Sequence, residues 1–190
     1  IEKVEHVILT HWHPDHTLWL RILEQLNMDF VNQKPFSNPI KVYISAWQLE
    51  MLKKMSCWGF LDFYISKWLI EIVNIEHKKD IVIDNITITP YFIEHTKWFY
   101  FVISDWNKKI VYAWCEYHNL EVYPEVNNTD WLIVHNLFWE NPEVSPRKSK
   151  PKDEDSFEKM LEDAKKMWTK NIYLVHIEET FKLWHDELWE

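Results

Sequence analysis

Short apolar runs alternate along the chain with longer segments in which apolar residues recur every three or four positions. The short runs predict β-strands, because buried strands are apolar over a few residues and are bounded by polar turns. We expect strands at residues 4–10, 40–45, 69–75, 81–83, 86–93, 99–104, 109–113, 131–134 and 171–175. The longer segments predict helices at residues 15–26, 46–55 and 157–167. Strands and helices that alternate in this way are typical of a layered α/β domain.

A polar stretch at residues 140–155 interrupts this alternation. It contains Pro142, Pro146 and Pro151 and has too little apolar area to bury, so we expect a surface loop there. The chain has no internal repeat and no other break in its pattern. We therefore expect residues 1–190 to form a single domain.

The composition is that of a globular protein, with 47% hydrophobic and 27% charged residues. A formal net charge of −9 argues against a dedicated nucleic-acid surface, since binding to polyphosphate requires clustered Lys and Arg. No run reaches the roughly 18 apolar residues of a membrane helix, so we expect no membrane partner. Two cysteines, Cys57 and Cys115, are too few for a disulfide framework, and the reducing cytoplasm is the expected location.

Glycine and tryptophan occur in abnormal numbers. The chain has one glycine and 13 tryptophans, whereas an average domain of this length has roughly 13 glycines. Trp106 lies between two strand-like runs, where a hairpin favours Asp-Gly, and Trp168 closes the last helical pattern, where glycine is usual. We hypothesise that most tryptophans occupy glycine positions of a parent sequence. A genuinely tryptophan-rich protein is the alternative.

The strongest chemical signal is a cluster of three histidines and one aspartate after the first predicted strand. The cluster consists of His11, His13, Asp15 and His16. Imidazole and carboxylate together suit a borderline divalent metal ion such as zinc, manganese or iron. His11 and His13 alternate as they leave the strand and can converge on one ion, while Asp15 and His16 lie at the turn into the helix. The alternative is a polar helix start with Asp15 as its N-cap, which leaves the three histidines unexplained.

Three further residues of metal-binding type follow other predicted strands. His95 follows the strand at 86–93, Cys115 the strand at 109–113, and His176 the strand at 171–175. Ligands in open α/β folds gather beyond the carboxyl ends of strands, so this shared placement points to one site. Taken singly, none of these residues indicates a metal ligand, because a lone histidine or a lone buried cysteine is more often part of the packing.

These motifs resemble those of the metallo-β-lactamase superfamily. The signature His-x-His-x-Asp-His is present as His11, His13, Asp15 and His16. Three later parts of the chain are similar to the later motifs of the family, and they occur in the same order. These are His95, the stretch Tyr112-Ala113-Trp114-Cys115 and the stretch Leu174-Val175-His176. The resemblance covers essentially the whole chain and is greatest to the branch of tRNase Z and the cyclic-phosphate phosphodiesterases. It implies a metallo-β-lactamase-like αββα sandwich.

Two features depart from the family pattern. Only ten residues precede His11, where the family has several strands. We therefore expect an incomplete first sheet whose exposed edge offers a route to a homodimer. Cys115 stands where the family usually has a bridging aspartate. A cysteine at this position resembles the Asp–Cys–His second metal site of some lactamases.

The resemblance implies two divalent metal ions, with zinc preferred over manganese or iron. One ion would be held by His11, His13 and His95, and the other by Asp15, His16 and His176, with Cys115 near or between them. Such a pair converts bound water into a nucleophile. Besides Asp15, the catalytic candidates are His135 and His118, which would support the ligands or protonate the leaving group. For both histidines, a role in packing or a place on the surface is an equally good explanation.

The resulting prediction is a metal-dependent hydrolase of phosphodiester or cyclic-phosphate bonds in a small or nucleotide-like substrate. A lactamase or thioesterase of the same superfamily is one alternative. A non-catalytic metal-binding or metal-sensing domain is another, to which Cys115 and the missing strands point. A third is an inert variant in which substitution of glycines has abolished folding.

Overall fold

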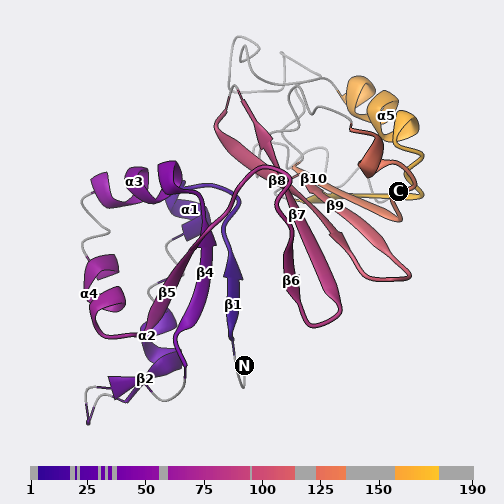
Figure 1. Ribbon diagram of the computed structural model, residues 1–190. Coiled ribbons are helices and arrows are strands. Elements are labelled where there is room, and N and C mark those ends of the chain that lie inside the picture. The colour runs from indigo at the N-terminus through magenta and orange to yellow at the C-terminus, as the bar shows by residue number, and fades with distance from the viewer. Residues whose placement is uncertain are drawn as a thin grey trace, which may run out of the picture. The chain divides into compact units, whose positions relative to one another are not determined.

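The computed structural model describes residues 4–17, 20, 22–29, 31–32, 34–35, 38–55, 60–94, 96–113, 123–135 and 157–175 (Figure 1). The chain divides into two compact units, Ile1–Glu76 and His77–Glu190. Each unit has its own β-sheet and its own buried core.

The first unit contains a parallel three-stranded sheet in the order β1-β4-β5. These strands span His6–Ile8, Ile40–Ile44 and Ile70–Asn74. Because the three strands are parallel, the loops that follow them leave from the same edge of the sheet. The loop after β1 carries the histidine motif, and the loop after β4 leads into α3 (Ala46–Lys54).

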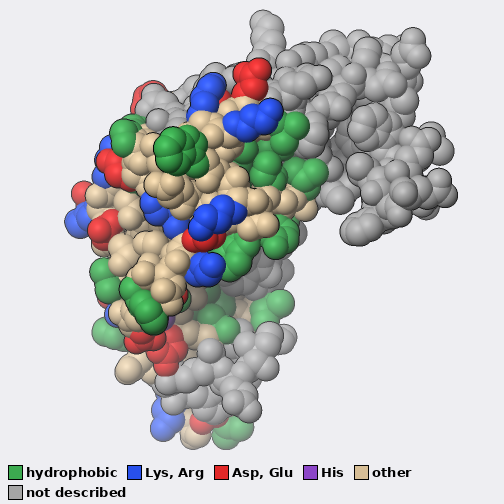
Figure 2. All heavy atoms as spheres, turned by 90° about the vertical axis from the view of Figure 1, so that its right-hand side faces the viewer, with side chains coloured by type: hydrophobic (Ala, Val, Ile, Leu, Met, Phe, Trp, Pro, Cys, Tyr) green, Lys and Arg blue, Asp and Glu red, His purple; other side chains and the backbone are tan. Residues whose placement is uncertain are grey.

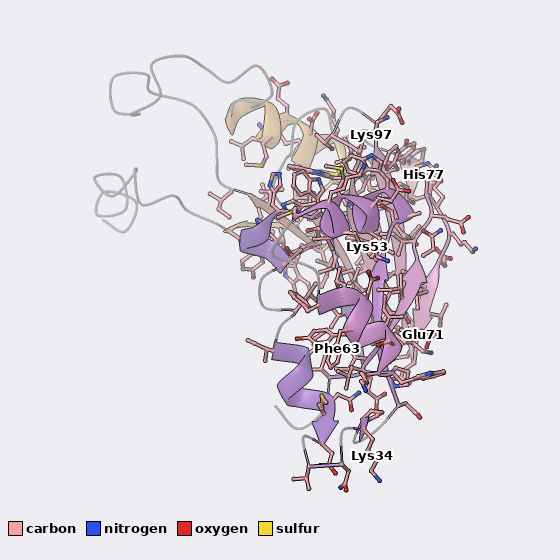
Figure 3. All side chains as sticks on the ribbon, turned by 90° about the vertical axis from the view of Figure 1, so that its left-hand side faces the viewer. Lys34, Lys53, Phe63, Glu71, His77 and Lys97 are labelled. Carbon is pink, nitrogen blue, oxygen red and sulfur yellow. The ribbon has the colours of Figure 1, made fainter. Side chains whose placement is uncertain are left out.

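Short helices and one small hairpin complete the described part of the first unit. The helices other than α3 are α1 (Pro14–Thr17), α2 (Ile22–Asn27) and α4 (Phe60–Ser66), and the hairpin pairs β2 (Met28–Asp29) with β3 (Lys34–Pro35). Strand side chains from β1 and β4 pack with buried leucines of these helices, and the core includes Val7, Val42, Leu23, Leu52 and Leu61. Lys53 of α3 also pairs with Asp62 of α4 at 2.7 Å, and Figure 3 labels Lys53 and the α4 residue Phe63.

The second unit contains a six-stranded sheet in the order β11-β10-β9-β8-β7-β6. In chain order, these strands span Ile81–Ile83, Ile86–Ile93, Trp98–Ser104, Lys109–Ala113, Trp131–His135 and Asn171–Val175. The first four pair as antiparallel hairpins, whereas β9, β10 and β11 are parallel. The described residues also include a 3-10 helix, η3 (Pro124–Val126), and the helix α5 (Phe157–Lys166).

Helix α5 covers the parallel part of this sheet. Met160, Ala164 and the following Met167 lie in one buried cluster with Val111 of β9 and Leu132 of β10. These residues are at most 3% exposed, so each removes nearly its whole apolar surface from water. The three- and four-residue spacing along α5 therefore predicted its buried face correctly.

The sequence pattern predicted the strands better than the helices. Every expected strand is present, with its ends within two residues of the expected ends. The single helix expected over residues 15–26 is wrong, because α1 and α2 are separate and Leu20 lies in a 3-10 turn. Thr17, the last residue of α1, is buried and donates its hydroxyl to the carbonyl of His13. The surface loop expected at residues 140–155 lies outside the described residues.

Two tryptophans follow helices with left-handed backbone conformations. Trp68 after α4 has φ 59°, and Trp168 after α5 has φ 52°. In each case the tryptophan N–H donates three residues back, and the next N–H donates five residues back. This is the Schellman helix end, whose left-handed position favours glycine because glycine has no Cβ. The structure thus confirms the expectation for Trp168 and extends it to Trp68.

The hairpin between β8 and β9 gives a different result for Trp106. This residue is not among those with positive φ. The turn is closed instead by Asp105, whose carboxylate accepts the N–H groups of Asn107 and Lys108, each at 2.7 Å. The expectation that Trp106 occupies a glycine-requiring turn position is therefore wrong for this backbone.

The described surface carries charges of both signs. Figure 2 shows one face, on which Lys and Arg side chains lie interspersed with Asp and Glu side chains. Within the described residues, none of the helices is long and apolar enough to cross a membrane.

Candidate metal centre

Three imidazoles of the histidine motif gather in the loop between β1 and α1. The ring centroid of His11 lies 4.8 Å from that of His13 and 4.3 Å from that of His16. His11 is completely buried, while His13 and His16 are half-buried. The chain can bring these rings together because it turns sharply here, with the N–H of His16 donating to the carbonyl of His13 at 3.1 Å.

A hydrogen bond fixes the orientation of the central ring. Oγ1 of Thr10 lies 2.9 Å from Nδ1 of His11. Metal-binding histidines usually engage one ring nitrogen in this way, which fixes the tautomer and presents the other nitrogen to the ion. Nε2 of His11, which is also buried, is thus the ring atom that would bind a metal. The donor set and its support therefore suit a divalent ion that prefers imidazole.

Two buried polar residues outside the predicted set hold the backbone of this loop. Thr17 donates its hydroxyl to the carbonyl of His13 at 2.8 Å. Gln48 of α3 donates its side-chain amide to the carbonyl of Thr10 at 2.8 Å. The Ser45-x-x-Gln48 spacing is a helix-start signature in the sequence, but nothing local indicates that Gln48 reaches a residue 38 positions earlier.

The remaining candidates follow strands that end at one edge of the six-stranded sheet. β7 is antiparallel to β8, which is antiparallel to β9, so β7 runs in the same direction as β9, β10 and β11. His135 ends β10, and His95, Cys115 and His176 come one or two residues after the ends of β7, β9 and β11. The sheet topology therefore confirms that these strand exits share one edge.

The described residues contain only part of the predicted ligand set. His95, Cys115, His118 and His176 lie outside them, and the side chains of Asp15 and His135 are likewise not described. Among the side chains that are described, no group of three or more His, Cys, Asp or Glu is arranged to hold a metal ion. The structure brings the rings of His11, His13 and His16 together, and the complete ligand set stays a prediction.

The strongest resolved pKa shift belongs to a residue at the opposite edge of the second sheet. Asp130 immediately precedes β10, and its pKa is lowered from 3.8 to about 2. The main cause is the hydrogen bond from Nζ of Lys170 at 2.8 Å, followed by the backbone N–H of Lys109 at 2.9 Å. Because the candidate residues follow the strands, Asp130 is part of the packing of the sheet and not of the candidate centre.

Comparisons with known proteins define the class to which this fold and motif belong. Residues 1–177 match the family model described as a beta-lactamase superfamily domain. The chain belongs to this metallo-β-lactamase superfamily, whose members are metal-dependent hydrolases and typically bind zinc or other divalent metals. No curated protein matches the chain in sequence.

Solved structures agree with this fold at low sequence identity. The metallo-beta-lactamase fold protein YhfI from Bacillus subtilis is 18% identical, with a TM-score of 0.64 over 90% of this chain and 64% of its own. A diphosphatase from the PhnP family is 16% identical, with a TM-score of 0.64 over 93% of this chain and 61% of its own. The short form of human tRNase Z is 14% identical, with a TM-score of 0.61 over 92% of this chain and 73% of its own.

These likenesses show a mixed α/β metallo-β-lactamase-like fold, as the sequence predicted. The chain spans less than two thirds of the length of YhfI and of the PhnP-family diphosphatase.

Proposed function

We propose that this protein is a metal-dependent hydrolase that cleaves a phosphodiester or cyclic-phosphate bond in a small or nucleotide-like substrate. The observation that carries the proposal is the gathering of three imidazoles, in which the ring centroid of His11 lies 4.8 Å from that of His13 and 4.3 Å from that of His16. Membership of a superfamily of metal-dependent hydrolases supports the reaction type.

The names of two similar structures support phosphorus as the reacting centre. One is a diphosphatase and the other a tRNase. At sequence identities of 16% and 14%, these two structures show only that the fold is shared. The substrate class of this protein is therefore our inference. It agrees with the order of the motifs at His95, Cys115 and His176, which resembles the phosphodiesterase branch.

The proposed ligands are the residues that the family motifs imply. His11, His13 and His95 would hold one ion, and Asp15, His16 and His176 a second, with Cys115 beside them. Zinc suits this set best, because imidazole nitrogens and a thiolate are its usual ligands. When bound, the ions supply a hydroxide near neutral pH and stabilise negative charge on oxygen.

The chain's own residues would then divide the remaining tasks. Thr10 holds the ring of His11 in the orientation that binding requires. Asp15 would complete the coordination from the start of α1. His135 and His118 are the proposed proton donors to the leaving oxygen. Imidazole suits this role in general, because it can both gain and release a proton near neutral pH.

The test is metal analysis of the purified full chain combined with hydrolysis of bis-p-nitrophenyl phosphate, a chromogenic lactam and a thioester. Two bound ions and metal-dependent cleavage of the phosphodiester are expected. Bound metal without turnover of any of the three substrates would contradict the proposal and favour a metal-sensing domain. Absence of both bound metal and cooperative unfolding would favour an inert variant.

Cys115 is the specific feature that favours the sensing alternative, since it stands where the family has a bridging carboxylate. Replacing it by aspartate, Cys115→Asp, tests whether Cys115 takes part in a hydrolytic metal centre. In a hydrolase with Cys115 at the ions, this change should alter both turnover and metal stoichiometry. Unchanged values of both would show that Cys115 does not bind the metal.

A further inference from the structure

Gln48 is a completely buried amide on the first turn of α3. Its backbone N–H donates to Oγ of Ser45 at 3.3 Å, and its Oε1 accepts the backbone N–H of Ser45 at 3.5 Å. These two contacts form a capping box, which satisfies N–H groups at the start of the helix. The backbone N–H of Ser45 therefore determines that Oε1, and not Nε2, faces the helix start.

The other end of the same amide leaves the helix. Nε2 of Gln48 donates to the backbone carbonyl of Thr10 at 2.8 Å. A capping box is equally well made by glutamate, but only glutamine also carries an N–H that can donate to a carbonyl. The residue type at position 48 is therefore explained by the contact with Thr10 and not by the capping of α3 alone.

The contact with Thr10 continues to the buried imidazole. The carbonyl that Gln48 holds belongs to the peptide that joins Thr10 to His11, so it fixes the direction in which the chain enters His11. The hydroxyl of the same Thr10 lies 2.9 Å from Nδ1 of His11. Gln48, Thr10 and His11 thus form one connected chain of contacts from α3 to the ring, and Gln48 and His11 are both completely buried.

We infer that Gln48 is a positioning residue of the proposed metal centre, which holds the Thr10 peptide so that the Thr10 hydroxyl orients the His11 ring toward the ion. This inference rests on the proposed function. It assigns Gln48 an effect on metal affinity and on coordination geometry in addition to its effect on the stability of α3. Supports of this kind around metal-binding histidines typically change metal affinity by about 10- to 100-fold.

The test compares two variants of the full chain that both damage the capping box. Gln48→Met has a side chain of similar length but lacks the donor to Thr10. Ser45→Ala removes Oγ of the cap and retains the backbone N–H of Ser45 and the amide of Gln48. Zinc affinity is measured by competition with a chromophoric chelator, the absorption spectrum of the cobalt-loaded protein reports geometry, and thermal unfolding without metal reports stability.

We expect Gln48→Met to weaken zinc binding by about 10- to 100-fold and to change the cobalt spectrum. Ser45→Ala should lower stability and leave zinc affinity within about twofold of that of the unchanged chain, since it acts on the cap alone. Equal zinc affinity and identical cobalt spectra in the unchanged chain and a folded Gln48→Met variant would overturn the inference. Failure of the unchanged chain to bind zinc or cobalt would instead overturn the proposed function.

A measurement on the unchanged chain covers the case in which Gln48→Met does not fold. The side-chain amide protons of Gln48 are followed by nitrogen-15 NMR during titration with zinc. We expect protection from exchange with water and a shift of this signal when zinc binds, because the amide is connected to His11 through Thr10. A signal that stays unchanged at saturating zinc would overturn the inference.

Discussion

Oγ1 of Thr10 lies 2.9 Å from Nδ1 of His11, the next residue along the chain. The hydroxyl engages one ring nitrogen of a completely buried imidazole, and in the proposed centre Nε2 would be the atom that binds the metal. The hydroxyl of the residue that precedes His11 in sequence is therefore one determinant of the ring orientation.

Replacing that side chain by an isosteric apolar one, Thr10→Val, should weaken zinc binding by about 10- to 100-fold, because the ring loses the contact that fixes its tautomer and orientation. Thr10→Ser, which keeps the hydroxyl, is the matched control and should retain most of the affinity. Competition with a chromophoric chelator measures both constants. Equal weakening by valine and by serine would show that packing of the threonine methyl group, and not the hydroxyl, is responsible.

His13→Ala should abolish binding of one metal ion and hydrolysis together while the fold is retained, because the half-buried ring of His13 has little core packing to lose. His6→Ala provides a control in the same unit, since His6 contacts the hydroxyl of Tyr43 through Nδ1 at 3.0 Å and lies outside the motif. Metal content by mass spectrometry and circular dichroism are the measurements. Full metal content in His13→Ala would contradict the ligand assignment.

Trp168→Gly and Trp68→Gly should each raise the free energy of unfolding by about 1 kcal/mol, because left-handed backbone is strained for residues with a Cβ. Little packing is lost, since these side chains are 71% and 66% exposed. Trp106→Gly is the matched control, because Trp106 is 83% exposed and is not among the positive-φ residues. Urea unfolding measures all three. A gain in Trp106→Gly as large as in the other two variants would show that backbone strain is not the cause.

The intact mass of the protein purified from its source tests the wider hypothesis about tryptophan. Each glycine in place of a tryptophan lowers the mass by a fixed amount, so the total gives the number of replaced positions directly. We expect a mass well below that of the printed sequence, which has 13 tryptophans. A mass equal to that of the printed sequence would support the tryptophan-rich alternative.

Asp130 should make stability depend on pH in the acid range. Its pKa is lowered from 3.8 to about 2 in the folded protein, chiefly by the hydrogen bond from Lys170, so folding favours the ionised form. Its contribution is therefore complete above 3.8 and is lost as the pH falls from there toward about 2. Asp130→Asn should be less stable than the unchanged chain at neutral pH, with the difference shrinking across that interval. Urea unfolding at a series of pH values measures this, and a constant difference would contradict the assignment.

The sequence was sufficient to predict the strands of the three- and six-stranded sheets, because their apolar runs are local signals. The two-residue strands β2 and β3 were missed, since they have no apolar run. It also predicted that His95, Cys115 and His176 follow strands whose carboxyl ends share an edge. The helix expected over residues 15–26 was wrong, since the three- and four-residue periodicity of apolar positions does not show where one helix ends and the next begins. Helix α4 was missed because its sequence, FLDFYIS, has weak helix propensity and is stabilised by burial of Leu61 and Tyr64.

The sequence by itself determined which side chains the histidine motif offers to a ligand, because His11, His13, Asp15 and His16 supply imidazole and carboxylate groups within six residues. Only the tertiary structure decided how that chemistry is held in place. Gln48 reaches Thr10 across 38 positions, and Trp68 adopts a left-handed backbone after α4. The contact between Gln48 and Thr10 follows from how separate segments pack together, and it leaves no periodic signal in the sequence around either residue. The conformation of Trp68 follows from the end of α4, a helix that its own sequence does not predict.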